Sequence, residues 1–129
     1  MTGSDCDLMS AQPYQLLLDA LQHEPDAAIF GRPIGEMWPK ESLGNYFEVI
    51  MRPMDLGTIQ RKLGNGKYRH VESLVADIGV VWSNCMTFNL KGTDYHETAV
   101  RMKARFDAGV ANIQRGLAVH LSSGGPGAQ

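Results

Sequence analysis

Side chains that commonly carry catalysis or bind metals are few and scattered in this sequence. The histidines lie far apart: His23, His70, His96 and His120. The two cysteines, Cys6 and Cys85, lie in a polar and a strongly apolar segment, which argues against a disulfide framework and a soft-ligand metal site. Zinc-protease, nucleophile-elbow and phosphate-binding glycine motifs are absent from the sequence. We therefore expect no catalytic residue, no metal and no cofactor.

The length and composition are those of one globular domain. The chain has 129 residues, of which 43% are hydrophobic and 20% are charged. Its net charge of -2 argues against a module for sequence-specific nucleic-acid binding but permits a basic partner. No apolar run is long enough to span a membrane. The small polar and Gly/Ser-rich ends predict disorder over residues 1–9 and 122–129, with the domain between them at residues 10–121.

Apolar residues inside this domain follow helical spacing, and no segment predicts a strand. A short first helix carries Tyr14, Leu17, Leu18 and Leu21 on one face. Ser10 is its candidate N-cap, which would place Pro13 in the first turn. Three further helices are expected from Asp55 to about residue 64, from about His70 to Phe88, and from Thr93 or Asp94 to Leu117. The pattern therefore predicts an all-α, four-helix domain.

A long irregular stretch, residues 24–54, separates the first and second of these helices. It holds four prolines and three glycines together with many large apolar residues. A loop of this length in a compact domain is usually functional, and its apolar content predicts that it packs on the helices. The second helix should begin sharply, since Pro53 favours an extended residue before it, Asp55 is a good N-cap, and Met54 and Ile59 have the spacing of a hydrophobic staple.

Two motifs in these segments resemble the bromodomain signature. Residues 46–59, YFEVIMRPMDLGTI, match its aromatic pair and its Pro-Met-Asp-Leu-x-Thr-Ile block. Residues 82–89, WSNCMTFN, which follow Asp77, resemble the end of that family's third helix with its aromatic-Asn pair. The resemblance covers roughly residues 12 to 118. It implies a left-handed four-helix bundle in which two loops form an acetyl-lysine pocket at one end.

The resemblance also implies a role for individual pocket residues. Asn89 would anchor the acetyl group, Tyr46 would hold a pocket water through its hydroxyl, and Tyr95 would guard the pocket from the start of the fourth helix. The other pocket residues would be Ile29, Phe30, Ile34, Trp38, Leu43, Cys85 and Phe88. Without the resemblance, Asn89 is read as a helix C-cap, Tyr46 as a core aromatic and Tyr95 as the first residue of a buried helix stripe.

Three departures from the common family pattern concern the first loop. Residues 28–30, Ala-Ile-Phe, replace an aromatic-Pro-Phe shelf, so the shelf should be less aromatic. Gly44-Asn45 replaces a frequent Pro-Asp, and an extra Trp38-Pro39 makes the loop about two residues longer. These changes affect the shape and ligand preference of the loop more than the fold.

The chemistry of the implied ligand suits these residue types. Acetylation turns the lysine ammonium into a neutral amide on an apolar stem, and an asparagine carboxamide can donate to its carbonyl. Unmodified lysine would bury a charge beside another donor at high cost. Four acids near the presumed rim, Glu24, Asp26, Glu36 and Glu41, could raise the association rate of a basic peptide.

The expected function is therefore a reader of acetylated lysine, with acetylated histone tails as partners and a nuclear location implied by the resemblance. We expect a monomeric domain within a larger protein or complex, without membrane contact. The altered loop leaves open an alternative, a bromodomain-fold interaction scaffold with a weak or inactive pocket. A small hydrolase is the other alternative, and no motif supports it.

Overall fold

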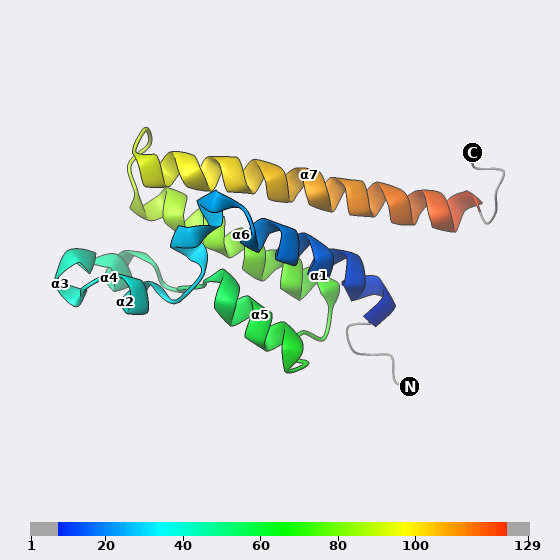
Figure 1. Ribbon diagram of the computed structural model, residues 1–129, viewed down its shortest axis with the longest axis horizontal. Helices are drawn as coiled ribbons and strands as arrows, with labels where there is room; N and C mark the ends of the chain where they lie inside the picture. The colour runs from blue at the N-terminus through cyan, green and yellow to red at the C-terminus, as the bar shows by residue number, and fades with distance from the viewer. Residues whose placement is uncertain (1–7, 124–129) are drawn as a thin grey trace.

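The computed structural model describes residues 8–123, in which every regular element is helical and no strand occurs (Figure 1). The elements are α1 (Leu8–Gln22), the 3-10 helix η1 (Pro25–Phe30), α2 (Ile34–Met37), α3 (Lys40–Leu43), α4 (Tyr46–Val49), α5 (Leu56–Gly64), α6 (Val71–Phe88) and α7 (Asp94–Ser123). The prediction of an all-α domain is confirmed. The four predicted helices correspond to α1, α5, α6 and α7.

The chain ends differ in detail from the predicted boundaries. Of the two segments expected to be disordered, residues 1–7 and 124–129 lie outside the described residues, while residues 8–9 and 122–123 belong to α1 and α7. Ser10 lies inside α1, since this helix begins at Leu8, so the prediction of Ser10 as N-cap is wrong. Pro13 consequently lies one turn further into the helix than expected, where its ring removes one backbone hydrogen bond.

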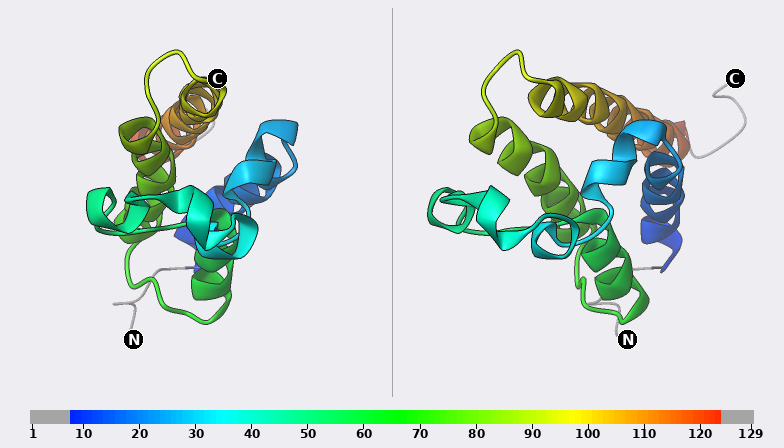
Figure 2. Two further views of the ribbon diagram at one scale, coloured as in Figure 1. Left: turned by 90° about the vertical axis from the view of Figure 1, so that its left-hand side faces the viewer. Right: turned by 60° about the vertical axis from the view of Figure 1, so that its left-hand side comes forward.

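The four long helices form a bundle around one apolar core. Helix α6 packs against α7, α5 and α1, and α1 also packs against α7. Figure 2 views the bundle from the end that carries the short helices. In the stripe predicted on the first helix, Tyr14, Leu18 and Leu21 are buried and Leu17 is partly buried. Ile59, Ile78 and Met102 on the other long helices are fully enclosed. A β-carbon at Gly109 would lie 2.6 Å from the Leu17 Cδ1 atom, so this glycine allows α1 and α7 to approach closely.

The predicted start of α5 is confirmed in atomic detail. The Asp55 carboxylate accepts hydrogen bonds from the Thr58 backbone N–H at 2.8 Å and from the Thr58 hydroxyl at 2.6 Å. Gly57 in the first turn lies against the loop after η1, because a β-carbon there would be only 2.4 Å from the Gly31 carbonyl oxygen. This close approach fixes the end of η1 beside α5 and so positions one wall of the pocket described below.

The stretch predicted as an irregular loop contains η1 and the three one-turn helices α2, α3 and α4. Gly44, with a φ of 56°, makes the sharp turn between α3 and α4. A second small apolar cluster holds the stretch to the bundle: Leu43, Tyr46 and Ile50 are buried and pack with Ile34 and Phe88. Figure 1 places these turns at the end of the bundle where α6 joins α7. The expectation that this stretch packs on the helices is therefore confirmed.

One buried charge ties several segments to the middle of α6. Asp77 is 2% exposed and accepts hydrogen bonds from Arg52, from Lys62 at 2.9 Å and from the Tyr68 hydroxyl at 2.7 Å. Burial alone would raise the pKa of Asp77, but these hydrogen bonds and the two positive charges outweigh it and hold the pKa below its usual value. The Arg52 carbonyl also accepts from Asn84 at 2.8 Å, so the end of the stretch is fixed to α6 twice.

Candidate ligand pocket

A cavity of about 250 Å³ lies between the segment from η1 to α5 and the end of the bundle formed by α6 and α7. All ten residues predicted for the pocket line it, so segments far apart in the sequence meet at one site. The structure adds five lining residues that the prediction missed: Arg32, Ser42, Met54, Asp55 and Val81. Met54 and Asp55 were interpreted only as a staple and a cap. Val81 lies one helical turn before Cys85, so helical spacing was a signal that could have found it.

Aromatic rings form much of the interior surface. Tyr46, which is 6% exposed, packs edge-on against Phe88 with ring centroids 4.8 Å apart, and against Phe47 at 5.3 Å. Burial raises the pKa of the Tyr46 hydroxyl, so this group is neutral at physiological pH. Within the described residues the hydroxyl makes no hydrogen bond, which leaves it available to a water or a ligand.

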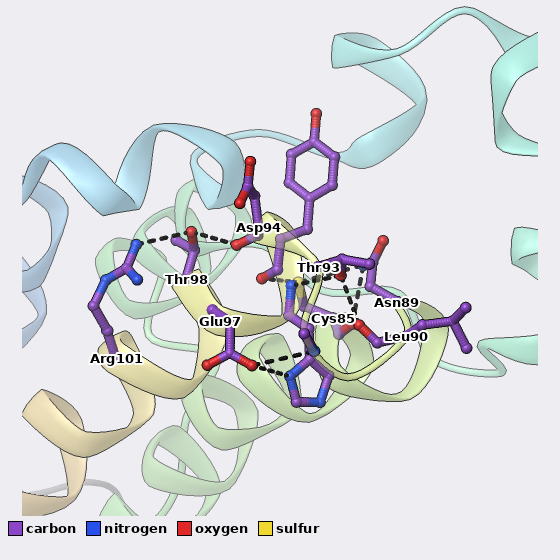
Figure 3. A network of polar contacts seen from close by, with 11 residues as sticks. Cys85, Asn89, Leu90, Thr93, Asp94, Glu97, Thr98 and Arg101 are labelled. Carbon is purple, nitrogen blue, oxygen red and sulfur yellow. Dashed lines mark hydrogen bonds and ion pairs between the residues drawn. The ribbon is translucent and has the colours of Figure 1, made fainter.

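Asn89 follows the last residue of α6, and its side chain bonds back to that helix (Figure 3). Its Nδ2 donates to the Cys85 carbonyl oxygen at 3.0 Å, which makes Asn89 a C-cap by side chain as well as by backbone. The same nitrogen lies 3.5 Å from the Cys85 Sγ atom, a weak acceptor. The carboxamide therefore retains one N–H for a stronger acceptor that enters the cavity, and its oxygen accepts no hydrogen bond from the described residues.

The Cys85 thiol is part of the pocket wall. It donates a hydrogen bond to the Tyr95 carbonyl oxygen at 3.3 Å. Burial raises the pKa of this thiol to about 11, and the hydrogen bond from Asn89 offsets this effect only partly. The thiolate is consequently scarce at neutral pH, and the group acts as a small apolar surface that also links α6 to α7.

A network of short-range hydrogen bonds around Leu90 and Thr93 sets the beginning of α7 (Figure 3). Tyr95 belongs to the first turn of this helix. The Thr93 hydroxyl donates to the Leu90 carbonyl oxygen at 2.7 Å and accepts from the His96 backbone N–H at 3.4 Å. Gly92, with a φ of 93°, makes the turn between them. Tyr95 is 42% exposed and lines the cavity, so it is not part of the buried stripe that begins with Ala99 on the same helix.

The lining side chains that remain exposed to solvent define the mouth of the cavity: Arg32, Trp38, Ser42 and Tyr95. Trp38, the extra loop tryptophan, reaches across to Tyr95, and the two rings meet edge to face with centroids 5.7 Å apart. Ile29, which represents the altered shelf, also lines the cavity with an aliphatic side chain. The cavity therefore has an aliphatic residue at this position of the shelf and an aromatic pair at its mouth.

Two of the four predicted rim acids are already balanced by positive charges. Asp26 accepts hydrogen bonds from Arg101 at 3.0 Å and from Arg105 at 2.9 Å, and these bonds lower the pKa of Asp26 to about 2. Glu24 lies 3.9 Å from Arg105. None of the four acids lines the cavity, so attraction of a basic peptide would depend mainly on Glu36 and Glu41.

The fold and the cavity define a class: helical-bundle proteins with a small, largely apolar pocket that presents a neutral asparagine amide. Within residues 8–123, no cluster of three or more His, Cys, Asp or Glu could hold a metal ion. In the same part of the chain, none of the helices has both the length and the apolarity needed to cross a membrane.

Comparison with known proteins places the chain in this class. The Bromodomain family model matches residues 14–101. The chain is 34% identical over 99 residues to human Bromodomain and PHD finger-containing protein 3, covering 74% of this chain and 8% of that protein. It is 42% identical over 71 residues to Bromodomain-containing factor 1 of Candida albicans, covering 55% of this chain and 10% of that protein.

A third relative is Histone acetyltransferase GCN5 of Debaryomyces hansenii, which is 34% identical over 87 residues, covering 67% of this chain and 18% of that protein. The chain therefore belongs to the bromodomain family, a family of acetyl-lysine readers. It spans less than a fifth of the length of these relatives, so the similarity concerns the reader domain and not the remaining parts of those proteins.

Proposed function

We propose that this domain binds acetylated lysine in the cavity described above, with acetylated histone tails as its targets. The observation that carries the proposal is the meeting, in one small cavity, of an amide donor from Asn89, a free hydroxyl from Tyr46 and mostly apolar walls. Asn89 would donate to the acetyl carbonyl, and the Tyr46 hydroxyl would hold a water that bridges to the same oxygen. No step of this function breaks or forms a covalent bond, so no catalytic residue is needed.

The electrostatics of the cavity support a preference for the modified form of lysine. An ammonium group entering the cavity would need a free carboxylate. The only lining carboxylate among the described residues, Asp55, already accepts two hydrogen bonds from Thr58. Arg32 at the mouth adds a positive charge that repels an ammonium but not a neutral amide. Discrimination would therefore come largely from the desolvation of the unmodified lysine.

The expected affinity is modest. One hydrogen bond contributes about 1 kcal/mol. Burial of roughly 100–150 Å² of methyl and methylene surface adds about 3 kcal/mol at ~25 cal/mol per Å². With contacts to the flanking peptide, this corresponds to a dissociation constant on the order of 10–1000 μM.

The wider setting of the proposal is a reader in chromatin regulation and transcription, in the nucleus. One relative is named as a histone acetyltransferase, which connects this type of domain with acetylated histones. A histone tail is basic, and the chain carries a net charge of -2. We propose that the domain acts as a monomer within a larger protein, without membrane contact or sequence-specific nucleic-acid binding.

The test compares two helix-capping asparagines. Titration of the wild-type domain with an acetylated histone peptide should shift the backbone amide signals of Asn89 and Tyr46, and the unmodified peptide should leave them in place. Asn89→Ala should abolish binding and cost about 1 kcal/mol of unfolding free energy, since one hydrogen bond to Cys85 is lost. Asn65→Ala, at the C-cap of α5 and away from the cavity, should bind normally.

Two outcomes would overturn the proposal. If acetylated peptides cause no shifts up to millimolar concentration, the domain is an interaction scaffold with an inactive pocket. If Asn89→Ala unfolds the domain while Asn65→Ala does not, Asn89 is chiefly a structural cap. A panel of acetylated histone peptides on an array would then identify the preferred site for a domain that passes both tests.

A further inference from the structure

The aromatic pair at the mouth of the cavity joins two separate parts of the molecule. Trp38 comes from the residues after α2, and Tyr95 comes from the first turn of α7. Their rings meet edge to face at 5.7 Å, and both side chains still expose a third or more of their surface, 36% for Trp38 and 42% for Tyr95. Other aromatic lining residues, such as Tyr46 and Phe30, are almost completely buried.

The backbone that carries each ring is held in place before any ligand arrives. Trp38 has extended dihedral angles, φ -126° and ψ 141°, which Pro39 after it favours, and its N–H bonds to the Ile34 carbonyl oxygen at 3.0 Å. The Tyr95 carbonyl oxygen accepts a hydrogen bond from the Cys85 thiol, and this bond fixes the first turn of α7 to α6. Little backbone conformational entropy is therefore lost when a ligand contacts these rings.

We propose that Trp38 and Tyr95 form a single recognition element that grips the four-carbon stem of the acylated lysine as it crosses the mouth. This inference rests on the proposed function. Exposed aromatic surface at a mouth is unfavourable in water and becomes favourable once an aliphatic chain covers it. Because the two rings contact each other, removal of either ring should leave the other free to change its orientation. The pair also supplies the aromatic contact that the short side chain of Ala28 and the aliphatic one of Ile29 do not.

The chain carries its own probe for this contact, because it has two tryptophans in different surroundings. Trp38 is at the mouth, whereas Trp82 is 1% exposed in the core. Titration with an acetyl-lysine peptide should change the intrinsic tryptophan fluorescence. Trp38→Phe should remove most of this change while calorimetry still shows binding within about threefold of wild type, since an aromatic ring remains.

A double-mutant cycle measures whether the two rings act together. Trp38→Ala and Tyr95→Ala should each weaken binding about tenfold, and the double variant should be much less than a hundredfold weaker, because the first change already disables the pair. Met51→Ala is the matched control, since Met51 is 85% exposed in the same segment and does not line the cavity. Propionyl-lysine peptides should lose the same factor as acetyl-lysine peptides in Trp38→Ala, because the rings contact the stem and not the acyl end.

The outcomes separate this inference from the proposed function. If wild-type protein binds acetylated peptide but Trp38→Ala binds equally well, or if the two losses multiply independently, the joint recognition element is refuted and the reader function stands. If Trp38→Ala weakens acetyl-lysine but not propionyl-lysine binding, Trp38 contacts the acyl group and the stem assignment is wrong. If the wild-type domain binds no acetylated peptide, both ideas fall together.

Discussion

Two polar sites on α6 differ in how completely their polar groups are hydrogen-bonded. Asp77 in the middle of the helix is 2% exposed and accepts hydrogen bonds from three side chains. Asn89 at the end of the helix uses one N–H for a C-cap and offers its oxygen to no atom of the described residues. Tyr46 beside it is buried with an unused hydroxyl, whereas the Tyr68 hydroxyl donates to Asp77.

The difference separates polar groups that stabilise the fold from polar groups that await a ligand. A buried polar group without a partner costs free energy, and the polar groups around Asp77 are paired with one another. Groups left with spare hydrogen-bonding capacity beside a cavity are instead available to an incoming molecule. Changes at the first site should therefore affect stability and leave affinity unchanged, and changes at the second should affect binding far more than stability.

Asp77→Ala should produce the largest loss of stability. It removes the common acceptor of Arg52, Lys62 and Tyr68, and we expect the free energy of unfolding to fall by about 3 kcal/mol. This value is at the lower end for a broken buried ion pair because Arg52 and Lys62 are partly exposed and can regain water. Urea unfolding followed by circular dichroism measures the change.

Asp107→Ala provides the control for this change, since Asp107 is 53% exposed and pairs with Lys103 on the surface of α7. Its loss should cost less than about 0.5 kcal/mol. At a temperature where Asp77→Ala remains folded, its affinity for an acetylated peptide should equal that of wild type. A stability loss below about 1 kcal/mol, or a large loss of affinity in the folded variant, would contradict the separation of the two sites.

The same carboxylate should make stability depend on pH in the acid range. Its pKa is lowered in the folded protein, so its contribution to stability is complete above about pH 4, the range of an unperturbed Asp, and is lost as pH falls through the folded-state pKa. Asp77→Asn should therefore flatten the decline of unfolding free energy below pH 4. The difference between the two proteins is the measured quantity, because Asp26 also has a lowered pKa and contributes equally to both. Parallel curves for wild type and Asp77→Asn would show that the ion network does not stabilise the fold.

Much of the fold was predictable because it depends on local spacing and capping. The apolar stripes on α5 and α6 and the Asp55 cap follow from the sequence directly. The four short helices in the stretch after α1 were not predicted, since each has only one or two turns and is held by contacts with distant residues. The Asp77 network was also missed, because its three donors lie 9 to 25 residues away along the chain and no spacing rule connects them.

For the pocket, the family resemblance pointed to the ten predicted residues but not to how they meet. Nothing in the sequence connects Trp38 with Tyr95, because their contact depends on the path of the chain through α2. Arg32 was missed for the same reason, since its place at the mouth follows from the turn between η1 and α2. The sequence did not reveal that Glu24 and Asp26 are paired, because their partner Arg105 on α7 is reached only through a tertiary contact.

Exchange of Tyr46 or Tyr68, one buried tyrosine at each site, for phenylalanine should give the smallest but most specific contrast between the sites. Tyr46→Phe removes a hydroxyl without an internal partner, so stability should change by less than about 0.5 kcal/mol, while the loss of a water-mediated bond should weaken acetyl-peptide binding about fivefold. Tyr68→Phe removes a donor to a buried carboxylate at 2.7 Å, so it should cost about 2 kcal/mol of stability and leave affinity unchanged. Calorimetric titration measures the affinity of both variants for the acetylated peptide, and urea unfolding measures their stability. Equal effects of the two substitutions on both quantities would mean that spare hydrogen-bonding capacity does not mark the binding site in this bundle.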